Sequence, residues 1–442
     1  MTLDADRLES SAAGTVEREA SGEPVDAEAQ ARALRRAERA RHRETAGSES
    51  RSRAHAAMRH GLLASTAGRL LAATAGVLAL LTVVGLAALW PGRLPGGTQQ
   101  AFGGRSLGAV VATAHTVRCP GPVTQRCRSL VVRVADGPDR GRRARLDLGP
   151  VDATPSLAPG AHVRVQHEGK GAYGFVDVDR RVPMLWLALA LVALAAVVAR
   201  LRGVLALVGV ILSVGVVVAF LVPAILAGSD PVAVSLTASL AVMFVTVLLT
   251  YGPGPQSLAA SVGIGLSLIL AALIGHVMVG GAHLDGRTGE LQQLLVLGAR
   301  GVSLQGVVLA GMVIGVLGVL TDMAVSQASA VTALHRADAT LGPRALYRGA
   351  FAVGRDHLAA TIHTLVLAYV GAALPLVLVL REAHVGAIDA VNGQIMAEPI
   401  VATLVGAIAL IAAVPLTTAF AAVLVARMPA ASLGAGHAHH PH

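Results

Sequence analysis

Apolar runs long enough to cross a bilayer recur along most of the chain. Eight of them are found, at 70–90, 183–199, 203–227, 231–250, 256–279, 304–325, 358–380 and 400–425. A helix of about 17–25 mainly apolar residues spans the hydrocarbon core, so the pattern predicts eight transmembrane helices. Arg200 and Arg202 separate the second run from the third, and they predict a tight hairpin between two helices instead of a kink within one.

The segment between the first and second runs has short alternating or β-branched stretches separated by turn signals. Asp136-Gly137-Pro138 and Ala158-Pro159-Gly160 are two of these signals. Five strands are predicted, at Leu107–Val117, Leu130–Val134, Ala144–Leu148, His162–Gln166 and Tyr173–Val178. Short strands at this spacing predict a small β-barrel or sandwich, with the OB type as one candidate.

The fold class is therefore an α-helical integral membrane protein with about eight transmembrane helices and a small extracytoplasmic β-rich domain between helices one and two. The first apolar run is longer than the 7–15 residues typical of a cleaved signal peptide, which favours a membrane anchor. The predicted parts are a charged, largely disordered cytoplasmic tail (1–69), helix one (70–90), the β-rich domain (91–182), a seven-helix membrane domain (183–425) and a cytoplasmic His-rich tail (426–442).

The distribution of positive charge predicts the orientation of the chain in the membrane. Of all residues, 54% are hydrophobic, and the mean hydropathy is +0.64. Cytoplasmic loops of membrane proteins carry excess Lys and Arg. Arginines gather before the first run, in the 200–202 hairpin, at 336–355 and at 427. Both termini are therefore predicted to be cytoplasmic, in the bacterial plasma membrane. The net charge of +9 is explained by this topology and indicates no nucleic-acid partner.

The two cysteines, Cys119 and Cys127, both lie in the predicted extracytoplasmic domain. Gly121 and Pro122 favour a turn between them, and disulfides persist in oxidising compartments. We therefore expect a disulfide that closes this loop. The alternative, a metal pair, needs more ligands, and only His115 is close in sequence, so no metal site is predicted.

Asp322 is the only charged residue in the sixth apolar run. An ionisable group at the centre of a membrane helix costs about 2.5–3.5 kcal/mol on insertion scales, so it is a functional-site hypothesis. Gly311, Gly315 and Gly318 share its helical face, and Ser326 and Ser329 extend that face. Small residues let a neighbouring helix approach closely. We expect this face to place Asp322, near the end of its helix, at a protein contact instead of in lipid.

The seventh run and its entry carry a second polar face. His357, Thr361 and Thr364 share this face, and Asp356 and His363 share an adjacent one. If the sixth and seventh helices pack through these faces, the acids and histidines converge with Asp322. Such a set suits proton relay or cation coordination. The alternative is that the small residues and threonines only hold helices together and that Asp356 and His357 are interfacial caps.

Two segments resemble the signature blocks of the YibE/F-like bacterial membrane proteins. They are Gly315–Leu334, GVLGVLTDMAVSQASAVTAL, and Val353–Leu378, VGRDHLAATIHTLVLAYVGAALPLVL. The resemblance extends over about 104–425. It implies a multi-spanning integral membrane protein with an extracytoplasmic β segment ahead of seven spans, and it implies no particular activity.

The resemblance also singles out individual positions. Asp322 corresponds to the family's acidic residue after the Gly-rich run, and Gln327 and Ser329 match its polar exit. In the second block the matching residues are Gly354, Arg355 and Asp356. Two positions depart from the pattern, because Thr321 stands where a second acid is common and His363 stands where Asn is usual. A paired-carboxylate site is therefore not expected. A cation site here must use Asp322 with neutral ligands or with His363.

The sequence contains no nucleophile elbow, P-loop, dinucleotide fingerprint or HExxH helix. We therefore predict no enzymatic activity and no cofactor. The first hypothesis is an ion- or proton-coupled transporter or permease with an ion or small molecule as substrate. The alternative is a non-transporting membrane scaffold or envelope-assembly factor that presents the β-rich domain to an envelope protein. A membrane-embedded enzyme is a third class, for which no nucleophile and base can be named.

The lipid bilayer is the one partner common to these hypotheses, and the sequence indicates no oligomeric state. The coupling candidates are Asp322, His363 and Asp356, and the path or packing candidates are Thr361, Thr364, Ser326, Gln327, Ser329, Gly315 and Gly318.

Overall fold

The computed structural model describes residues 66–92, 106–119, 125–169, 172–288 and 301–428. Ser65–Arg427 forms one compact unit. The predicted charged tail, up to residue 65, and the His-rich tail, from residue 429, lie outside the described residues.

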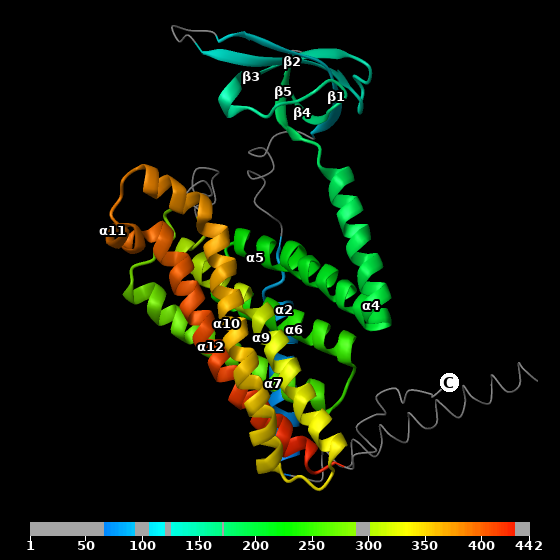
Figure 1. The fold of residues 1–442 in the computed structure, drawn as a ribbon, viewed down its shortest axis with the longest axis vertical. Helices are drawn as coiled ribbons and strands as arrows, with labels where there is room; N and C mark the ends of the chain where they lie inside the picture. Colours follow the sequence, from blue (N-terminus) through cyan, green and yellow to red (C-terminus); the bar gives the residue numbers. More distant parts are fainter. Residues whose placement is uncertain (1–65, 93–105, 120–124, 170–171, 289–300, 429–442) are drawn as a thin grey trace, which may run out of the picture. The chain divides into compact units, whose positions relative to one another are not determined.

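The described residues contain eight helical segments long and apolar enough to cross a membrane, which confirms the predicted number of candidate spans. The α-helices, short ones included, are α2 (Thr66–Ala88), α4 (Arg181–Val216), α5 (Val222–Leu226), α6 (Pro231–Tyr251), α7 (Pro255–Gly281), α9 (Leu304–Ala337), α10 (Pro343–Glu382), α11 (Ala387–Asn392) and α12 (Gln394–Val425) (Figure 1). Two of the eight candidate spans come from α4 and α5, which the π-helical turn Val217–Leu221 joins.

The predicted break at 200–203 is present within α4. Arg200 has φ 52° and ψ −138°, outside the helical region, and it separates spans Arg181–Leu201 and Gly203–Leu226. The two segments approach each other closely at Gly203. If this residue had a side chain, its Cβ would lie 2.4 Å from the carbonyl oxygen of Ala195. Only glycine leaves room for this approach.

Helices α9 and α10 extend well beyond the apolar runs that predicted them. The expected runs were 304–325 and 358–380, whereas the helices contain 34 and 40 residues. Apolar residues on the added turns, among them Val331, Leu346 and Ala350, are buried, so packing continues where the hydropathy falls. The expectation that Asp322 lies near the end of its helix is therefore wrong, because α9 continues for four more turns.

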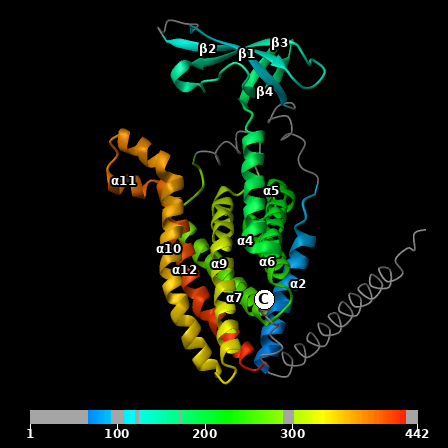
Figure 2. The ribbon, with the colours of Figure 1, turned by 45° about the vertical axis from the view of Figure 1, so that its right-hand side comes forward.

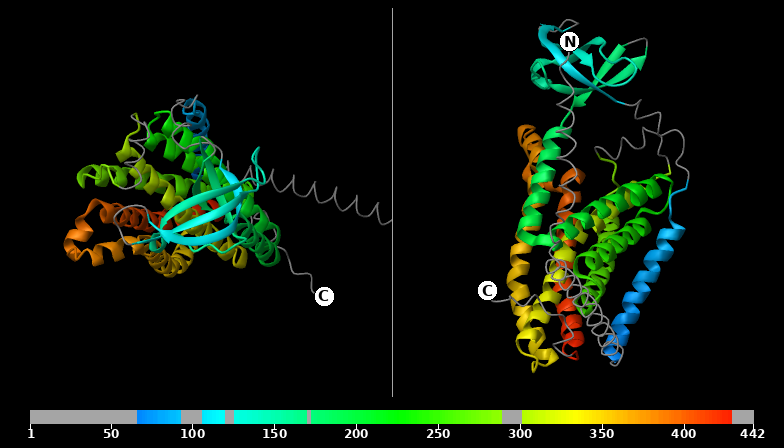
Figure 3. Two further views of the ribbon diagram at one scale, coloured as in Figure 1. Left: turned by 90° about the horizontal axis from the view of Figure 1, so that it is seen from above. Right: turned by 90° about the vertical axis from the view of Figure 1, so that its right-hand side faces the viewer.

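Helix α9 is the central element of the bundle and packs against α6, α7, α10 and α12 (Figure 2). Small residues let the backbones approach. A Cβ on Gly263 of α7 would lie 2.0 Å from Oγ1 of Thr417 in α12, and one on Gly275 would lie 2.6 Å from Leu309 in α9. Helix α2 packs against α6 and α7 (Figure 3).

The β-rich domain has the five predicted strands, and they form an antiparallel sheet. Its strands are β1 (Leu107–Arg118), β2 (Arg126–Val134), β3 (Arg143–Pro150), β4 (His162–Gly169) and β5 (Ala172–Val178), in the order β3-β2-β1-β4-β5. Strand β3 also contacts β5, so the sheet curls into a partly open barrel of the OB type. Its core includes Leu130, Val132, Leu146, Val163 and Val165, each at most 1% exposed.

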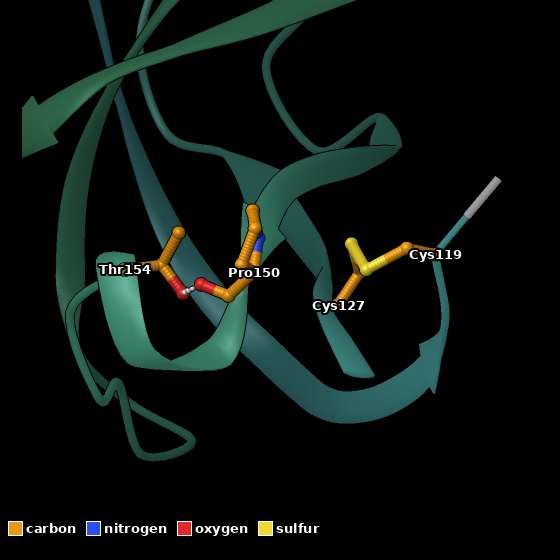
Figure 4. Close-up of a disulfide and its surroundings, with 4 residues drawn as sticks. All are labelled: Cys119, Cys127, Pro150 and Thr154. Atoms are coloured by element: carbon orange, nitrogen blue, oxygen red, sulfur yellow. Dashed lines mark hydrogen bonds between the residues drawn. A yellow bond between two sulfur atoms is a disulfide. The ribbon is translucent and has the colours of Figure 1, made fainter. Parts of the chain in front are cut away.

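A disulfide joins Cys119, just after β1, to Cys127 in β2 (Figure 4). Cys127 pairs with Val117 on one side and with Pro150 of β3 on the other. The 3-10 turn Val151–Ala153 follows β3, and the Thr154 hydroxyl closes it by donating to the Pro150 carbonyl at 2.9 Å. The disulfide therefore fixes the end of the β1–β2 pair beside this turn.

Candidate functional site

Asp322 and His357 face each other across the contact between α9 and α10. The His357 Nε2 atom lies 3.9 Å from Oδ2 of Asp322, and the two side chains are 43% and 71% exposed. Both helices belong to the apolar bundle, so a carboxylate and an imidazole lie side by side on two neighbouring candidate spans. This contact is the one that the two polar faces predicted.

Three further contacts fix the antiparallel register of α9 and α10. A Cβ on Gly349 would lie 3.0 Å from Leu334, and one on Gly315 would lie 3.0 Å from the Tyr369 hydroxyl. Between these positions, a Cβ on Gly354 would lie 2.5 Å from both polar atoms of the Gln327 amide. Asp322 and His357 lie within this continuous contact, so the helix pair sets their separation.

The turn between the two helices supports the same register. The Asp338 carboxylate accepts hydrogen bonds from the Thr340 hydroxyl at 2.6 Å and the Thr340 backbone N–H at 2.9 Å. These bonds, the hydroxyl first, hold the pKa of Asp338 below its ordinary value. Pro343 then occupies the first turn of α10, where its missing N–H is tolerated.

Gln327 forms a buried polar contact one turn beyond Asp322. It is 1% exposed, and its Oε1 lies 3.0 Å from the hydroxyl of Thr418 in α12. Two residues further along α9, the Ser329 hydroxyl accepts a hydrogen bond from the Gln256 side chain of α7. These hydrogen bonds link α9 to α12 and α7 within about two helical turns of Asp322.

The threonines of α10 bond mainly to their own helix. The Thr361 hydroxyl donates to the His357 carbonyl at 2.8 Å and lies 3.5 Å from the Met323 sulfur. The Thr364 hydroxyl donates to the Ala360 carbonyl and is exposed. Thr361 therefore lies beside the pair, whereas Thr364 lies two turns beyond His357.

Two of the three coupling candidates are not brought to Asp322. Asp356 and His363 are exposed, and neither forms an ion pair within the described part of the chain. Helix geometry explains their separation. At about 100° per residue, Asp356 and His363 project from other sides of α10 than His357 does. Their roles stay predictions.

The glycine face of α9 differs from the expectation. Gly315 contacts Tyr369, but a Cβ on Gly311 or Gly318 would meet no described atom within 4 Å. The prediction of a closely approaching helix along the whole face is therefore wrong at these two positions. Within the described residues the face is therefore open at Gly311 and Gly318 and is contacted by Tyr369 at Gly315.

The donor set around Asp322 limits its chemistry. No group of three or more His, Cys, Asp or Glu side chains able to hold a metal occurs among the described residues. Ser326 lies one helical turn from Asp322 on the same face and is partly buried. One carboxylate, one imidazole and nearby hydroxyls suit proton exchange or a weakly bound monovalent cation better than a transition metal.

Thr418 and Gln256 were not predicted as partners in this region. Both are polar residues within or at the start of apolar runs. Their polarity in such a setting was the one feature of the sequence that could have indicated an interhelical contact. Which helix each one faces depends on contacts between distant segments, and one sequence does not contain that information.

A family model described as YibE/F-like protein matches residues 187–427, just over half of the chain. Every candidate residue of the helices lies within this match. The five-stranded sheet lies outside it, so the resemblance expected over 104–425 is shown for the helical part. No curated protein and no solved structure matches the chain.

Proposed function

The chain belongs to the YibE/F-like family, and we propose that it is a multi-pass protein of the bacterial plasma membrane that couples movement of protons or another cation to transport of a substrate. The observation that carries this proposal is the Asp322–His357 pair on two neighbouring spans. We assign the protein no catalytic activity, and both termini lie in the cytoplasm.

The proposed position in the membrane follows from helix length. Leu304 begins α9, and Asp322 follows 18 residues later, a rise of about 27 Å at 1.5 Å per residue. The hydrocarbon core is about 30 Å thick. Asp322 therefore lies near the cytoplasmic boundary when Leu304 lies at the outer one. The only two tryptophans, Trp90 after α2 and Trp186 early in α4, then lie at the outer interface.

This position suits an entry site for a proton or cation. In this proposal the two exposed side chains exchange ions with the cytoplasm. From Asp322, the face of α9 that carries Gly318 and Gly311 runs along the apolar band, and an added Cβ at either glycine would meet no described atom within 4 Å. Imidazole changes charge between about pH 5 and 8. In this proposal Asp322 holds the ion, and His357 changes the charge next to it.

Reconstituted proteoliposomes test the proposal. Wild type, Asp322→Asn and a control, Asp389→Asn, are compared for charge movement across a panel of pH values and cations. Asp389 is an exposed carboxylate on α11. We expect current in wild type and in the control, and its loss in a folded Asp322→Asn protein. Full current in Asp322→Asn contradicts the proposal.

The second candidate function is a membrane scaffold or envelope-assembly factor. It is favoured by the interhelical bonds of Gln327 and Gln256, which give those polar residues a packing role. A scaffold gives no current in wild type under any condition of the panel. Asp322→Asn would then change only thermal stability, and an envelope protein captured by the β-rich domain would be its partner.

A further inference from the structure

Strands β2 and β3 carry a row of arginines on one face. Leu130, Val132 and Val134 of β2 point into the core and are at most 1% exposed. Residues alternate between the two faces of a strand, so Arg133 lies on the opposite face. Across the pair, Arg133 faces Arg143, and Val131 faces Arg145. We call Arg133, Arg143 and Arg145 the arginine patch.

The fold gains little from the charge of the patch, although Arg145 Nε donates a hydrogen bond to the Ser129 hydroxyl at 3.0 Å. Arg133 and Arg143 are directly opposite in register, and like charges in such pairs destabilise a sheet. Neither has an acidic partner within the described residues. Arg145 lies 3.3 Å from Asp147, but both side chains are more than 60% exposed, and such pairs contribute little.

The hairpin loop after β2 extends the patch. Arg140 and Arg142 are exposed there, and Arg142 lies 3.8 Å from Asp139. Asp136 instead accepts from the Gly108 N–H, and it lies 3.8 Å from Arg164. Positive charge therefore continues from Arg145 along the hairpin as a row.

A row of exposed guanidinium groups along two neighbouring strands fits a chain better than a single small anion. Opposed Cβ atoms in an antiparallel pair are about 4.5–5.5 Å apart, and diagonal neighbours are about 7–8 Å apart. Several anionic groups of one polymer can therefore be bound at once. A phosphate group offers more acceptor oxygens than a carboxylate does, in a tetrahedral arrangement that two guanidinium groups can approach from different sides.

The same face is a poor surface for insertion into a bilayer. Amphipathic segments that insert into the bilayer interface carry apolar side chains beside their basic residues. Among the described residues of the sheet, the only exposed large hydrophobic side chain is Val176, which belongs to β5. We propose that the arginine patch binds a linear polymer that carries phosphate groups along its chain. This site is separate from the proposed transport site.

Binding of fluorescent linear polyphosphate tests the proposal. The full-length protein is held in nanodiscs of zwitterionic lipid, and fluorescence anisotropy gives the dissociation constant. Arg143→Glu is the main variant, and Arg126→Glu is the matched control. Arg126 faces Arg118 in the other opposed arginine pair, at the disulfide end of the sheet. Each variant removes one positive charge, adds one negative charge and creates an opposed ion pair.

We expect Arg143→Glu to weaken binding at least about tenfold and to lower the salt dependence of binding, because fewer phosphates are neutralised. Arg126→Glu should change both much less. The thermal midpoint should be equal or higher in Arg143→Glu, since an opposed arginine and glutamate replace two arginines. Unfolding then cannot explain the loss.

Three results would overturn the proposal. The first is equal weakening by Arg126→Glu, which indicates general charge attraction. The second is unchanged binding in Arg143→Glu. The third comes from flotation with phosphatidylglycerol vesicles. If wild-type nanodiscs bind these vesicles through Arg143 and fail to bind polyphosphate, the patch recognises a membrane surface. None of these measurements depends on ion transport, so failure of the transport proposal leaves this one standing.

Discussion

Gln327 and Gly354 approach so closely that no side chain fits at position 354. A Cβ there would lie 2.5 Å from both the nitrogen and the oxygen of the buried Gln327 amide. The contact therefore depends on glycine in α10 and an amide in α9, and it lies within the register that aligns Asp322 with His357.

Gly354→Ala should destabilise the helix pair. The added methyl group forces the Gln327 side chain or the helices apart, and overpacking of this kind costs about 1–3 kcal/mol. Thermal unfolding of the protein in detergent measures the effect. Gly318→Ala is the matched control, because a Cβ there meets no described atom within 4 Å. It should leave the midpoint unchanged or raise it slightly through helix propensity. A lower midpoint in the control alone would contradict the packing.

The Gln327–Thr418 contact should appear as coupling in a double-mutant cycle. Gln327→Leu and Thr418→Val each remove one polar partner, and the double variant removes both. We expect a coupling free energy of about 0.6 kcal/mol, the average measured for hydrogen bonds between membrane helices, and at most about 1.7 kcal/mol. Unfolding free energies of the four proteins measure it. Additive effects would show that α9 and α12 are not joined by this bond.

His357→Gln should reduce charge movement more than His363→Gln does. Both substitutions remove an exposed imidazole from α10, but only His357 lies beside Asp322. We expect at least about a tenfold loss for His357→Gln, equivalent to about 1.4 kcal/mol. The double variant with Asp322→Asn should be no less active than Asp322→Asn alone, because the two residues act as one unit. Equal losses for the two histidine variants would remove the reason for pairing His357 with Asp322.

The sequence predicted the sheet well because strand signals are local. Alternation and the turn residues around Gly137 and Gly160 place all five strands. Strand β2 begins at Arg126, four residues earlier than the expected Leu130, since the apolar run marks only the part of the strand that reaches the core. The earlier residues of β2 pair with β1 and β3 through the backbone, and the hydropathy pattern does not show this pairing.

The sequence predicted the correct number of candidate spans. It did not predict the ends of α9 and α10 or the polar partners of α9. Hydropathy marks where a helix meets lipid, whereas the ends of α9 and α10 are set by Asp338 and by Pro343. The partners Gln256 and Thr418 depend on packing between distant segments. Helical periodicity placed His357 on the correct face of α10, and the same periodicity separates it from His363.

Removal of the disulfide should destabilise the β1–β2 pair without affecting the helices. The bond closes a loop between residues eight apart in sequence, and chain entropy for such a loop gives about 2–3 kcal/mol. Cys119→Ser/Cys127→Ser should raise hydrogen exchange in β1 and β2, while α9 and α12 keep their protection. Reduction of the wild type should reproduce this change and should have no effect on the double variant. Unchanged exchange in the strands would show that the sheet is held by its core alone.

Tyr173 should give the sheet a stability that is lost at high pH. Its side chain is buried in the core of the domain, and its hydroxyl donates a hydrogen bond to the Asp139 carboxylate. That bond raises the pKa of Tyr173 above its ordinary value of 10.0, because it requires the protonated phenol. The contribution of this hydrogen bond to stability is therefore complete at neutral pH and is lost as the pH rises through the raised pKa.

At neutral pH, Tyr173→Phe should show faster hydrogen exchange in β5 and in the 135–142 loop than wild type, after normalisation to unstructured rates at each pH. The difference should close as the pH rises beyond 10.0 and through the raised pKa, where the wild-type phenol ionises beside Asp139. A difference that persists at high pH would indicate that the ring, and not the proton, supplies the stability.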